Sequence, residues 1–223
     1  VYDMGSVLAA FLEVSYATLL GTEGNDSLSG TAEDDVIHAL GGDDYIEDFG
    51  GSNIIWAGAG NDDIVVAGNN AIDAGPGDDR VNLVVGNQIV HFAPGSGSDL
   101  VIHNVDNNIT VIEMAEGLTV ADIEVSLTDG DWGEVPVITL MASGDSITFN
   151  PVRYVQALED FEIVPDSETA SLRFSDGTVI AASDLFSMAD SGGENIVGTE
   201  GDDLLTGTDG NDIITGGRGN DFM

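Results

Sequence analysis

Five aspartates recur through the first half of the chain, and each one closes a glycine-rich turn. They are Asp26, Asp44, Asp62, Asp79 and Asp99, with intervals of 18, 18, 17 and 20 residues. Carboxylates at such a spacing are hard oxygen ligands, and glycine allows backbone carbonyls to come close beside them. Ca²⁺ accepts six to eight oxygens in irregular geometry, whereas Mg²⁺ requires a tighter octahedron. The pattern therefore predicts several calcium sites.

The aspartates belong to a nine-residue repeat of six turn residues followed by three strand residues. The first block reads GTEGNDSLS (21–29), GTAEDDVIH (30–38), ALGGDDYIE (39–47), DFGGSNIIW (48–56) and AGAGNDDIV (57–65). A second block reads GTEGDDLLT (198–206), GTDGNDIIT (207–215) and GGRGNDFM (216–223). Strands of three residues are not stable alone, so two repeats must form one coil and the coils must stack in parallel.

One aliphatic residue per repeat is expected to face inward and to form the core of this stack. These residues are Leu28, Ile37, Ile46, Ile55 and Ile64, continued by Ile72, Val81 and Ile89. The intervals of 8, 9 and 8 residues after Ile64 imply that the sixth and eighth repeats are one residue short.

Stacking in pairs places the turns of odd and even repeats on two different edges of the stack. The odd edge carries the five aspartates. On the even edge Asp35 is followed by Asn53, Ala71 and an acid-free stretch around Asn87 at the equivalent positions. We therefore expect calcium along the odd edge, and an even edge mostly without metal that is held by an asparagine ladder through Asn53, Asn69 and Asn87.

The composition restricts the partners. The net charge is −37, from 41 acidic residues and only four basic ones, so nucleic acid and anionic membranes are excluded and a cation is the expected partner. No cysteine is present, which excludes disulfides and thiolate metal sites, and no stretch is long enough to span a membrane. The first residues lack the features of a signal peptide, and the last repeat stops in mid-strand, as expected for a fragment of a longer protein.

Outside the repeats the sequence predicts a cap, a small β-rich domain and the start of a second roll. The apolar residues 1–20 are expected to cap the first coil. Residues 105–190 show short alternating strands, a hairpin over 171–180 with Asp176-Gly177 at its turn, and a short helix over 181–189. Residues 191–223 contain the second, truncated repeat block. The fold class is thus all-β: a right-handed parallel β-roll over 21–104, a β-rich domain with one short helix, and the start of a second roll.

The turns GTEGND, AGAGND, GTDGND and GGRGND resemble the RTX (repeats-in-toxin) nonapeptide, a calcium-binding repeat of parallel β-rolls. The segments EMAEGLTVADIEVSL, GDSITF and LRFSDGTVI are similar to the haemolysin-type calcium-binding related domain that follows such repeats. The resemblance implies an ion between turns two repeats apart. The first turn supplies its second and fourth carbonyls and its sixth-position aspartate, and the later turn supplies its first and third carbonyls and its own aspartate.

Applied to this chain, the resemblance implies four sites on the odd edge, one at the C-terminus and one on the even edge that should be weak or empty. The odd-edge ligands are Thr22, Gly24 and Asp26 with Ala39, Gly41 and Asp44; Leu40, Gly42 and Asp44 with Ala57, Ala59 and Asp62; Gly58, Gly60 and Asp62 with Ala74, Pro76 and Asp79; and Gly75, Gly77 and Asp79 with Pro94, Ser96 and Asp99. The C-terminal ligands are Thr199, Gly201 and Asp203 with Gly216, Arg218 and Asp221. The even-edge set is Thr31, Glu33 and Asp35 with Asp48, Gly50 and Asn53.

The function expected from these features is that of a non-catalytic calcium-binding module of a secreted, toxin-like bacterial protein. It would leave the low-calcium cytosol unfolded, through a type I system by the resemblance, and fold outside on binding Ca²⁺. Two alternatives remain: the C-terminal tail of a secreted hydrolase or epimerase, and an adhesin or surface-layer module with a cell-surface or glycan partner. Self-association through open roll ends is a further candidate. The three histidines, His38, His91 and His103, fit no catalytic motif and are expected to be surface or packing residues.

Overall fold

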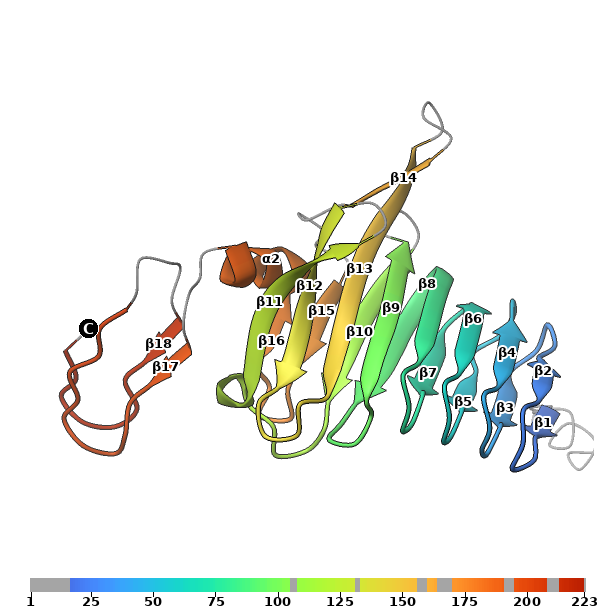
Figure 1. The fold of residues 1–223 in the computed structure, drawn as a ribbon, viewed down its shortest axis with the longest axis horizontal. Helices are drawn as coiled ribbons and strands as arrows, with labels where there is room; N and C mark the ends of the chain where they lie inside the picture. The colour runs from blue at the N-terminus through green and yellow to red at the C-terminus, as the bar shows by residue number, and fades with distance from the viewer. Residues whose placement is uncertain are drawn as a thin grey trace, which may run out of the picture.

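A computed structural model describes residues 17–104, 108–130, 133–155, 160–163, 170–190, 195–207 and 213–222. Residues 17–104 form a stack of flat coils, each made of two short strands joined by turns, and each strand pairs in parallel with its counterpart in the next coil (Figure 1). The all-β parallel β-roll predicted from the repeats is therefore confirmed. Most of the predicted cap lies outside the described residues, and its last four residues form the first strand, β1 (Ala17–Leu20).

The strands of the roll form two faces, and neighbours within each face are parallel. The A face contains, in spatial order, β1, β3 (Asp35–His38), β5 (Ile54–Trp56), β7 (Asn70–Asp73), the second half of β8 (Arg80–Phe92), β10 (Asn108–Met114) and β15 (Ala170–Arg173). The B face contains β2 (Ser27–Ser29), β4 (Tyr45–Asp48), β6 (Asp63–Ala67), the first part of β8, β9 (Ser98–Asn104) and β13 (Ser146–Val155). Parallel stacking thus continues beyond Asn104, where the sequence repeat ends.

The core of the roll consists of two columns of aliphatic side chains, one from each face. In the A column Leu19, Ile37, Ile55, Ile72, Val90, Ile112 and Leu172 lie in register. In the B column Leu28, Ile46, Ile64, Val81 and Val101 do the same. Alternation of side chains along each strand sends these residues inward and their neighbours outward.

One core assignment from the sequence is wrong. Val90, not Ile89, continues the inward column, because Ile72 pairs with Val90 and the Val90 side chain is buried. Ile89 pairs with Ala71 on the outer surface. The inward spacing from Ile64 is therefore 8, 9 and 9 residues, so the eighth repeat has full length and only the sixth is short. The coils adapt to the missing residue by a register shift between β6 and β8: Val66 pairs with Leu83 and Ala67 with Val85, so that Val84 of β8 bulges out of the pairing.

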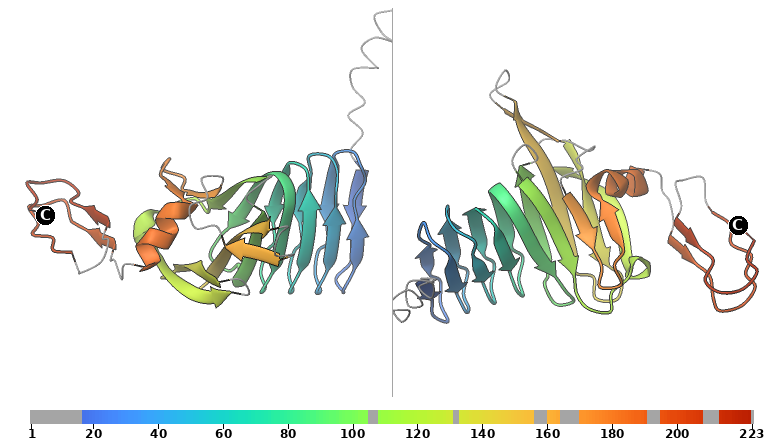
Figure 2. Two further views of the ribbon diagram at one scale, coloured as in Figure 1. Left: turned by 90° about the horizontal axis from the view of Figure 1, so that it is seen from above. Right: turned by 180° about the vertical axis from the view of Figure 1, so that it is seen from behind.

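The remaining strands close the C-terminal side of the roll with antiparallel pairings. β11 (Ile123–Gly130), β12 (Gly133–Leu140) and β13 form one antiparallel set, and β14 (Asp160–Ile163) pairs with β13. A short 3₁₀ helix, η1 (Val120–Asp122), precedes β11. The predicted hairpin is confirmed: β15 pairs antiparallel with β16 (Val179–Ala181). The predicted helix is confirmed as α2 (Ala182–Asp190; Figure 2). Its Leu185 is buried in the core.

In the second repeat block β17 (Asn195–Val197) pairs in parallel with β18 (Ile213–Thr215), and Leu204 bridges to Phe222. This block repeats the coil geometry of the first one.

The neighbours Ile54 and Ile55 allow the core column to be tested with matched substitutions. Ile55 is fully buried, whereas the Ile54 side chain is 41 % exposed on the outer surface. Ile55→Ala should lower the free energy of unfolding by about 2 to 5 kcal/mol, because it leaves a cavity in the stack, and Ile54→Ala by less than about 1 kcal/mol. Urea unfolding of both variants at saturating calcium measures the difference, and equal effects would contradict the assigned register.

Candidate calcium-binding edges

The turns of the odd edge stack so closely that only glycine fits at several positions. Gly97 has φ +95°, and a Cβ added to it would lie 2.0 Å from the carbonyl oxygen of Gly77 in the preceding coil. The main chains of successive turns are therefore in direct contact. This contact brings the carbonyl groups of the turns together along one line, as a site made of carbonyl oxygens requires.

The five predicted aspartates form a continuous hydrogen-bonded ladder, which we call the inner ladder. Each backbone N–H donates to Oδ1 of the aspartate in the next coil: Asp26 to Asp44 (2.7 Å), Asp44 to Asp62 (2.8 Å), Asp62 to Asp79 (2.8 Å) and Asp79 to Asp99 (3.1 Å). The longer interval before Asp99 does not interrupt the ladder. All of its members except Asp26 are buried.

A second ladder, formed by the fifth residue of each turn, was not predicted. In this outer ladder each backbone N–H donates to the side chain of the preceding coil: Asp43 to Asn25 (3.0 Å), Asn61 to Asp43 (2.9 Å), Asp78 to Asn61 (2.9 Å) and Ser98 to Asp78 (3.0 Å). Its hydrogen bonds run in the opposite direction to those of the inner ladder. The signal in the sequence is the Asn or Asp that precedes each of the first four inner-ladder aspartates.

The second oxygen of the inner-ladder carboxylates has no partner in the middle of the ladder. Oδ2 of Asp44, Asp62 and Asp79 is buried and makes no hydrogen bond. At the start of the ladder, Asp26 Oδ2 accepts hydrogen bonds from the backbone N–H (2.6 Å) and the hydroxyl (2.9 Å) of Thr22. A buried carboxylate oxygen without a donor is costly, and a cation between the coils would satisfy it.

Burial also changes the acidity of these groups. Burial, followed by the repulsion of neighbouring aspartates, raises the pKa of Asp62 to about 6, of Asp79 to about 7 and of Asp99 to about 8, while the backbone N–H of the preceding coil opposes each rise. The pKa of Asp44 is also raised, mainly by burial. A bound divalent cation would reverse the balance and favour the ionised form.

The predicted carbonyl ligands line the same edge and also link the coils. Six of those on the odd edge accept a hydrogen bond from the backbone N–H of an adjacent coil: Thr22 from Gly41 (3.1 Å), Leu40 from Ala59 (3.0 Å), Ala59 from Gly42 (2.8 Å), Ala74 from Gly58 (3.0 Å), Pro76 from Gly60 (3.0 Å) and Ser96 from Gly77 (2.9 Å). Because a carbonyl oxygen has two lone pairs, this bond leaves one available for a metal. The described residues contain no group of three or more His, Cys, Asp or Glu side chains suited to a metal. The predicted sites have two carboxylates each and depend on carbonyls for the rest.

The irregular turn before Asp99 is held by a residue that sequence reasoning missed. Asp145 accepts hydrogen bonds from the backbone N–H of Gly95 (Oδ2, 2.7 Å) and of Gly97 (Oδ1, 3.0 Å). These bonds lower the pKa of Asp145. Asp145 precedes β13, 46 residues after Asp99, and no local pattern connects it to the repeats.

The predicted C-terminal ligands come together in the same way. The backbone N–H of Asp203 donates to Asp221 Oδ1 at 3.1 Å, and the backbone N–H of Arg218 donates to the Thr199 carbonyl at 3.3 Å. Asp203 Oδ2 accepts a hydrogen bond from the Thr199 N–H at 2.7 Å, as Asp26 does from Thr22. The Arg218 side chain lies at the exposed surface near Glu200 (Nη1 to Oε2, 3.5 Å).

The even edge has an amide ladder, but not through the residues predicted. Asn53 and Asn70 occupy the sixth position of successive turns: the backbone N–H of Asn53 donates to Asn70 Oδ1 at 3.1 Å, and Asn53 Nδ2 donates to the same oxygen at 2.8 Å. Gln88 follows at the equivalent position and donates from Nε2 to the Gly68 carbonyl at 2.9 Å. Asn70, not Ala71, is therefore the sixth-position residue.

Asn69 and Asn87 lie one position earlier and form an outer pair, in which the Asn87 N–H donates to Asn69 Oδ1 at 3.1 Å. The single ladder through Asn53, Asn69 and Asn87 is thus wrong, because these residues belong to two separate ladders.

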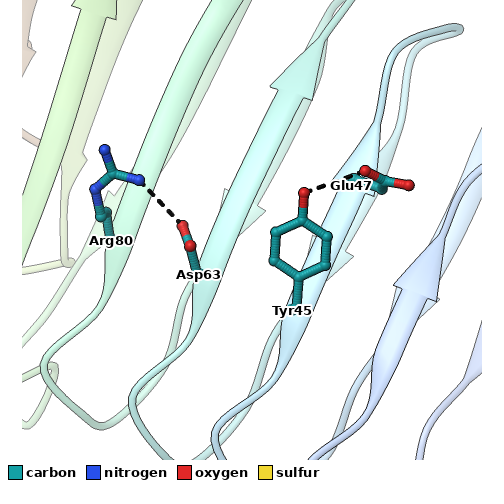
Figure 3. Close-up of polar contacts among 4 residues, drawn as sticks. All are labelled: Tyr45, Glu47, Asp63 and Arg80. Atoms are coloured by element: carbon teal, nitrogen blue, oxygen red, sulfur yellow. Dashed lines mark hydrogen bonds and ion pairs between the residues drawn. The ribbon is translucent and has the colours of Figure 1, made fainter.

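The histidines take structural positions. His38 stacks on Trp56 with ring centroids 4.4 Å apart, and His91 Nδ1 lies 3.3 Å from Glu113 Oε2 on the surface. His103 is buried, and burial lowers its pKa to about 4; its Nδ1 lies 2.8 Å from the Thr110 hydroxyl. The outer surface of the B face carries further polar pairs, including Tyr45 with Glu47 and Asp63 with Arg80 (Figure 3).

Comparison with known proteins gives one family. The model of the RTX calcium-binding nonapeptide repeat matches four segments: residues 20–47, 50–66, 66–87 and 188–223. No curated protein matches the chain. The matched segments include the first four inner-ladder aspartates and both aspartates of the C-terminal pair, whereas Asp48 falls between two matched segments.

Proposed function

Because this chain carries RTX calcium-binding nonapeptide repeats stacked as a parallel β-roll, we propose that calcium binding along the odd edge is what makes it fold. The observation that carries this proposal is the row of buried, unpartnered Oδ2 atoms on Asp44, Asp62 and Asp79. Without a cation the coil stack contains several buried carboxylates with raised pKa values. A Ca²⁺ ion between successive turns would supply the missing partner and offset their repulsion.

The proposed ligands are those of the four odd-edge sets and the C-terminal set. Each ion would be held by two inner-ladder carboxylates and by carbonyl oxygens of the two turns that they close. Asp44, Asp62 and Asp79 would each serve two neighbouring sites, so that binding at one site prepares the next one.

The fold of the whole roll would then depend on the calcium concentration around it. The net charge of −37 opposes compaction at low calcium, and extracellular calcium modules have dissociation constants of about 10⁻⁴ to 10⁻³ M. A chain with these properties stays unfolded in the cytosol and folds after export. We therefore propose a secreted, non-catalytic calcium-dependent folding module. In the described part of the chain no helix has the length and apolarity needed to cross a membrane.

Removal of calcium tests this proposal directly. In EDTA the chain should show the circular dichroism of an unfolded polypeptide, and millimolar Ca²⁺ should restore the β spectrum cooperatively. Millimolar Mg²⁺ is the matched control and should leave the chain largely unfolded. A β spectrum in EDTA that calcium does not change would overturn the proposal.

A second candidate, an adhesin or surface-layer module, is favoured by one feature of the even edge. A groove of about 420 Å³ lies there, lined by the aliphatic residues Ile54, Ala71, Ile89 and Val111 and by the amides of Asn69 and Asn87. Amides beside an apolar floor suit a neutral glycan better than an anionic ligand. A glycan array without a reproducible hit would set this candidate aside.

A further inference from the structure

The even edge contains two buried carboxylates that the amide ladder does not use. Asp35 and Asp48 are each only 1 % exposed. Asp35 is the single acid at the sixth position of an even turn in the first block. Asp48 stands at the first position of the next even turn, where the odd-edge turns from Gly21 to Ala74 have only glycine or alanine. Its side chain is therefore an exception to the repeat.

Asp48 reaches back towards the coil that contains Asp35. A Cβ added to Gly30, the first residue of the Asp35 turn, would lie 1.9 Å from Asp48 Oδ2, so the carboxylate occupies space that only glycine leaves open. The two carboxylates are close enough for the charge of Asp35 to act on Asp48 directly.

Each carboxylate has one satisfied oxygen and one without a partner. Asp35 Oδ2 accepts hydrogen bonds from the N–H (2.6 Å) and hydroxyl (3.0 Å) of Thr31, and Asp48 Oδ1 accepts one from the Gly50 N–H (3.0 Å). Asp35 Oδ1 and Asp48 Oδ2 are buried and make no hydrogen bond. One oxygen of each carboxylate thus accepts a backbone N–H, while the other is buried without a donor.

No basic side chain of the described residues supplies that partner. The sequence has no lysine, and the described arginines pair elsewhere: Arg80 with Asp63, Arg173 with Glu113 and Arg218 with Glu200. The amide of Asn53 is also engaged, because its Nδ2 donates to the Gly50 carbonyl and to Asn70 Oδ1. The described residues therefore supply no counter-charge for this pair.

We propose that Asp35 and Asp48 together bind a hard divalent cation, Ca²⁺ by its abundance outside the cell, on the otherwise amide-lined even edge. The Asp48 side chain replaces, from the first position of its turn, the carboxylate that Asn53 lacks at the sixth. Carboxylate and carbonyl oxygens are the donors that such an ion prefers. This inference rests on the proposed calcium-dependent function, and it adds a site that the sequence analysis expected to be weak or empty.

The number of calcium ions bound per chain tests the inference. Equilibrium dialysis of the full chain against Ca²⁺, with bound metal measured by atomic emission, should show that Asp48→Asn binds one ion fewer than the unsubstituted chain. The asparagine keeps an acceptor for the Gly50 N–H, so the turn should remain folded. Asp34→Asn is the matched control: Asp34 Oδ1 accepts a hydrogen bond from the Ser52 N–H at 2.8 Å, which an amide can also accept, and this variant should lose no ion.

A crystal of the unsubstituted chain grown with a lanthanide in place of calcium gives a second measurement that needs no variant. It should show an anomalous peak between Asp35 and Asp48 as well as peaks along the odd edge. Peaks on the odd edge alone, or an unchanged stoichiometry in Asp48→Asn, would overturn this inference and leave the proposed function standing. A chain that binds no calcium at all would overturn both.

Discussion

Replacing Asp62 with asparagine is expected to stabilise the calcium-free roll and to weaken the calcium-bound one. Asp62 lies in the middle of the inner ladder, where its Oδ1 accepts the N–H of Asp44 and its Oδ2 is buried without a partner. An amide oxygen can still accept the bond from Asp44, but the buried negative charge is gone. In the calcium-free roll the substitution therefore removes the cost of a buried charge. In the calcium-bound roll it removes a ligand from two metal sites.

The pH at which the calcium-free gain appears is set by the pKa of Asp62. Burial raises this pKa from 3.8 to about 6, so the folded chain holds the proton more tightly than the unfolded chain. The stability of the calcium-free roll consequently falls as the pH rises from about 4 to about 6. The advantage of Asp62→Asn should be on the order of 1 to 3 kcal/mol at pH 8 and should shrink towards pH 4.

In the presence of calcium Asp62→Asn is expected to destabilise the roll instead. Asp62 is proposed to bind two neighbouring ions, and affinity at such sites depends on the number of charged ligands, so the calcium concentration at half-folding should rise about tenfold or more. Calcium titrations followed by circular dichroism, and urea unfolding in metal-free buffer with a stabilising osmolyte, measure the two effects. Asp63→Asn is the control, since Asp63 is half-exposed and only pairs with Arg80 at 3.4 Å (Figure 3); it should change either quantity little. A destabilised calcium-free roll in Asp62→Asn would contradict the assigned electrostatics.

Gly97→Ala should unfold or strongly destabilise the C-terminal part of the roll. Its added Cβ would lie 2.0 Å from the Gly77 carbonyl oxygen, far inside the contact distance, so two coils would have to move apart. That movement would also strain the hydrogen bond from the Asp79 N–H to Asp99 in the inner ladder. We expect a loss of roughly 3 kcal/mol or more at saturating calcium, beyond the cost of an alanine at positive φ.

Gly95 supplies a closely matched control for this substitution. It has the same φ of +95° in the same turn, and its N–H also donates to Asp145, but a Cβ added there would meet no atom within 4 Å. Gly95→Ala should therefore cost only about 1 to 2 kcal/mol, the usual penalty of the left-handed conformation. Thermal and urea unfolding of the two variants compare them, and similar losses would show that the coil contact at Gly97 is not the cause.

The repeat made much of the fold predictable from the sequence. A strict period fixes which residue of each unit faces inward, so Ile37, Ile46, Ile55 and Ile64 could be assigned to the core without a structure. The same period brought the inner-ladder aspartates onto one edge. These predictions depend only on spacing, which the sequence states directly.

Predictions failed where the period changes by a single residue. The bulge at Val84, opposite Val66 and Ala67, shifts the register of the later repeats, and the sequence does not show whether the lost residue belongs to a strand or to a turn. Ile89 and Val90 are both aliphatic, as are Ile54 and Ile55, so hydrophobicity alone did not separate the inward from the outward residue. Once the register is known, the hydrogen bonds of Asn70 show which position of the turn this residue occupies.

The contacts of Asp48 and Asp145 were out of reach for a different reason. Asp145 joins the turn at Gly95 from 50 residues away, and Asp48 fills space above Gly30 in another coil. Both depend on which main-chain segments become neighbours after stacking. A repeat template describes only what every unit shares. It therefore cannot predict the contacts of residues in which one unit differs from the others.

The carboxylate ladder of the odd edge and the amide ladder of the even edge lie on alternate turns. This alternation determines how many repeats such a protein can gain or lose at once in evolution. Duplication or loss of a whole coil keeps aspartate above aspartate on one side, where Asp44 follows Asp26, and amide above amide on the other, where Asn70 follows Asn53. Loss of a single nine-residue unit would transfer all downstream turns to the opposite side and join the carboxylate column to the amide column. Natural size variants of this roll should therefore differ by even numbers of repeats.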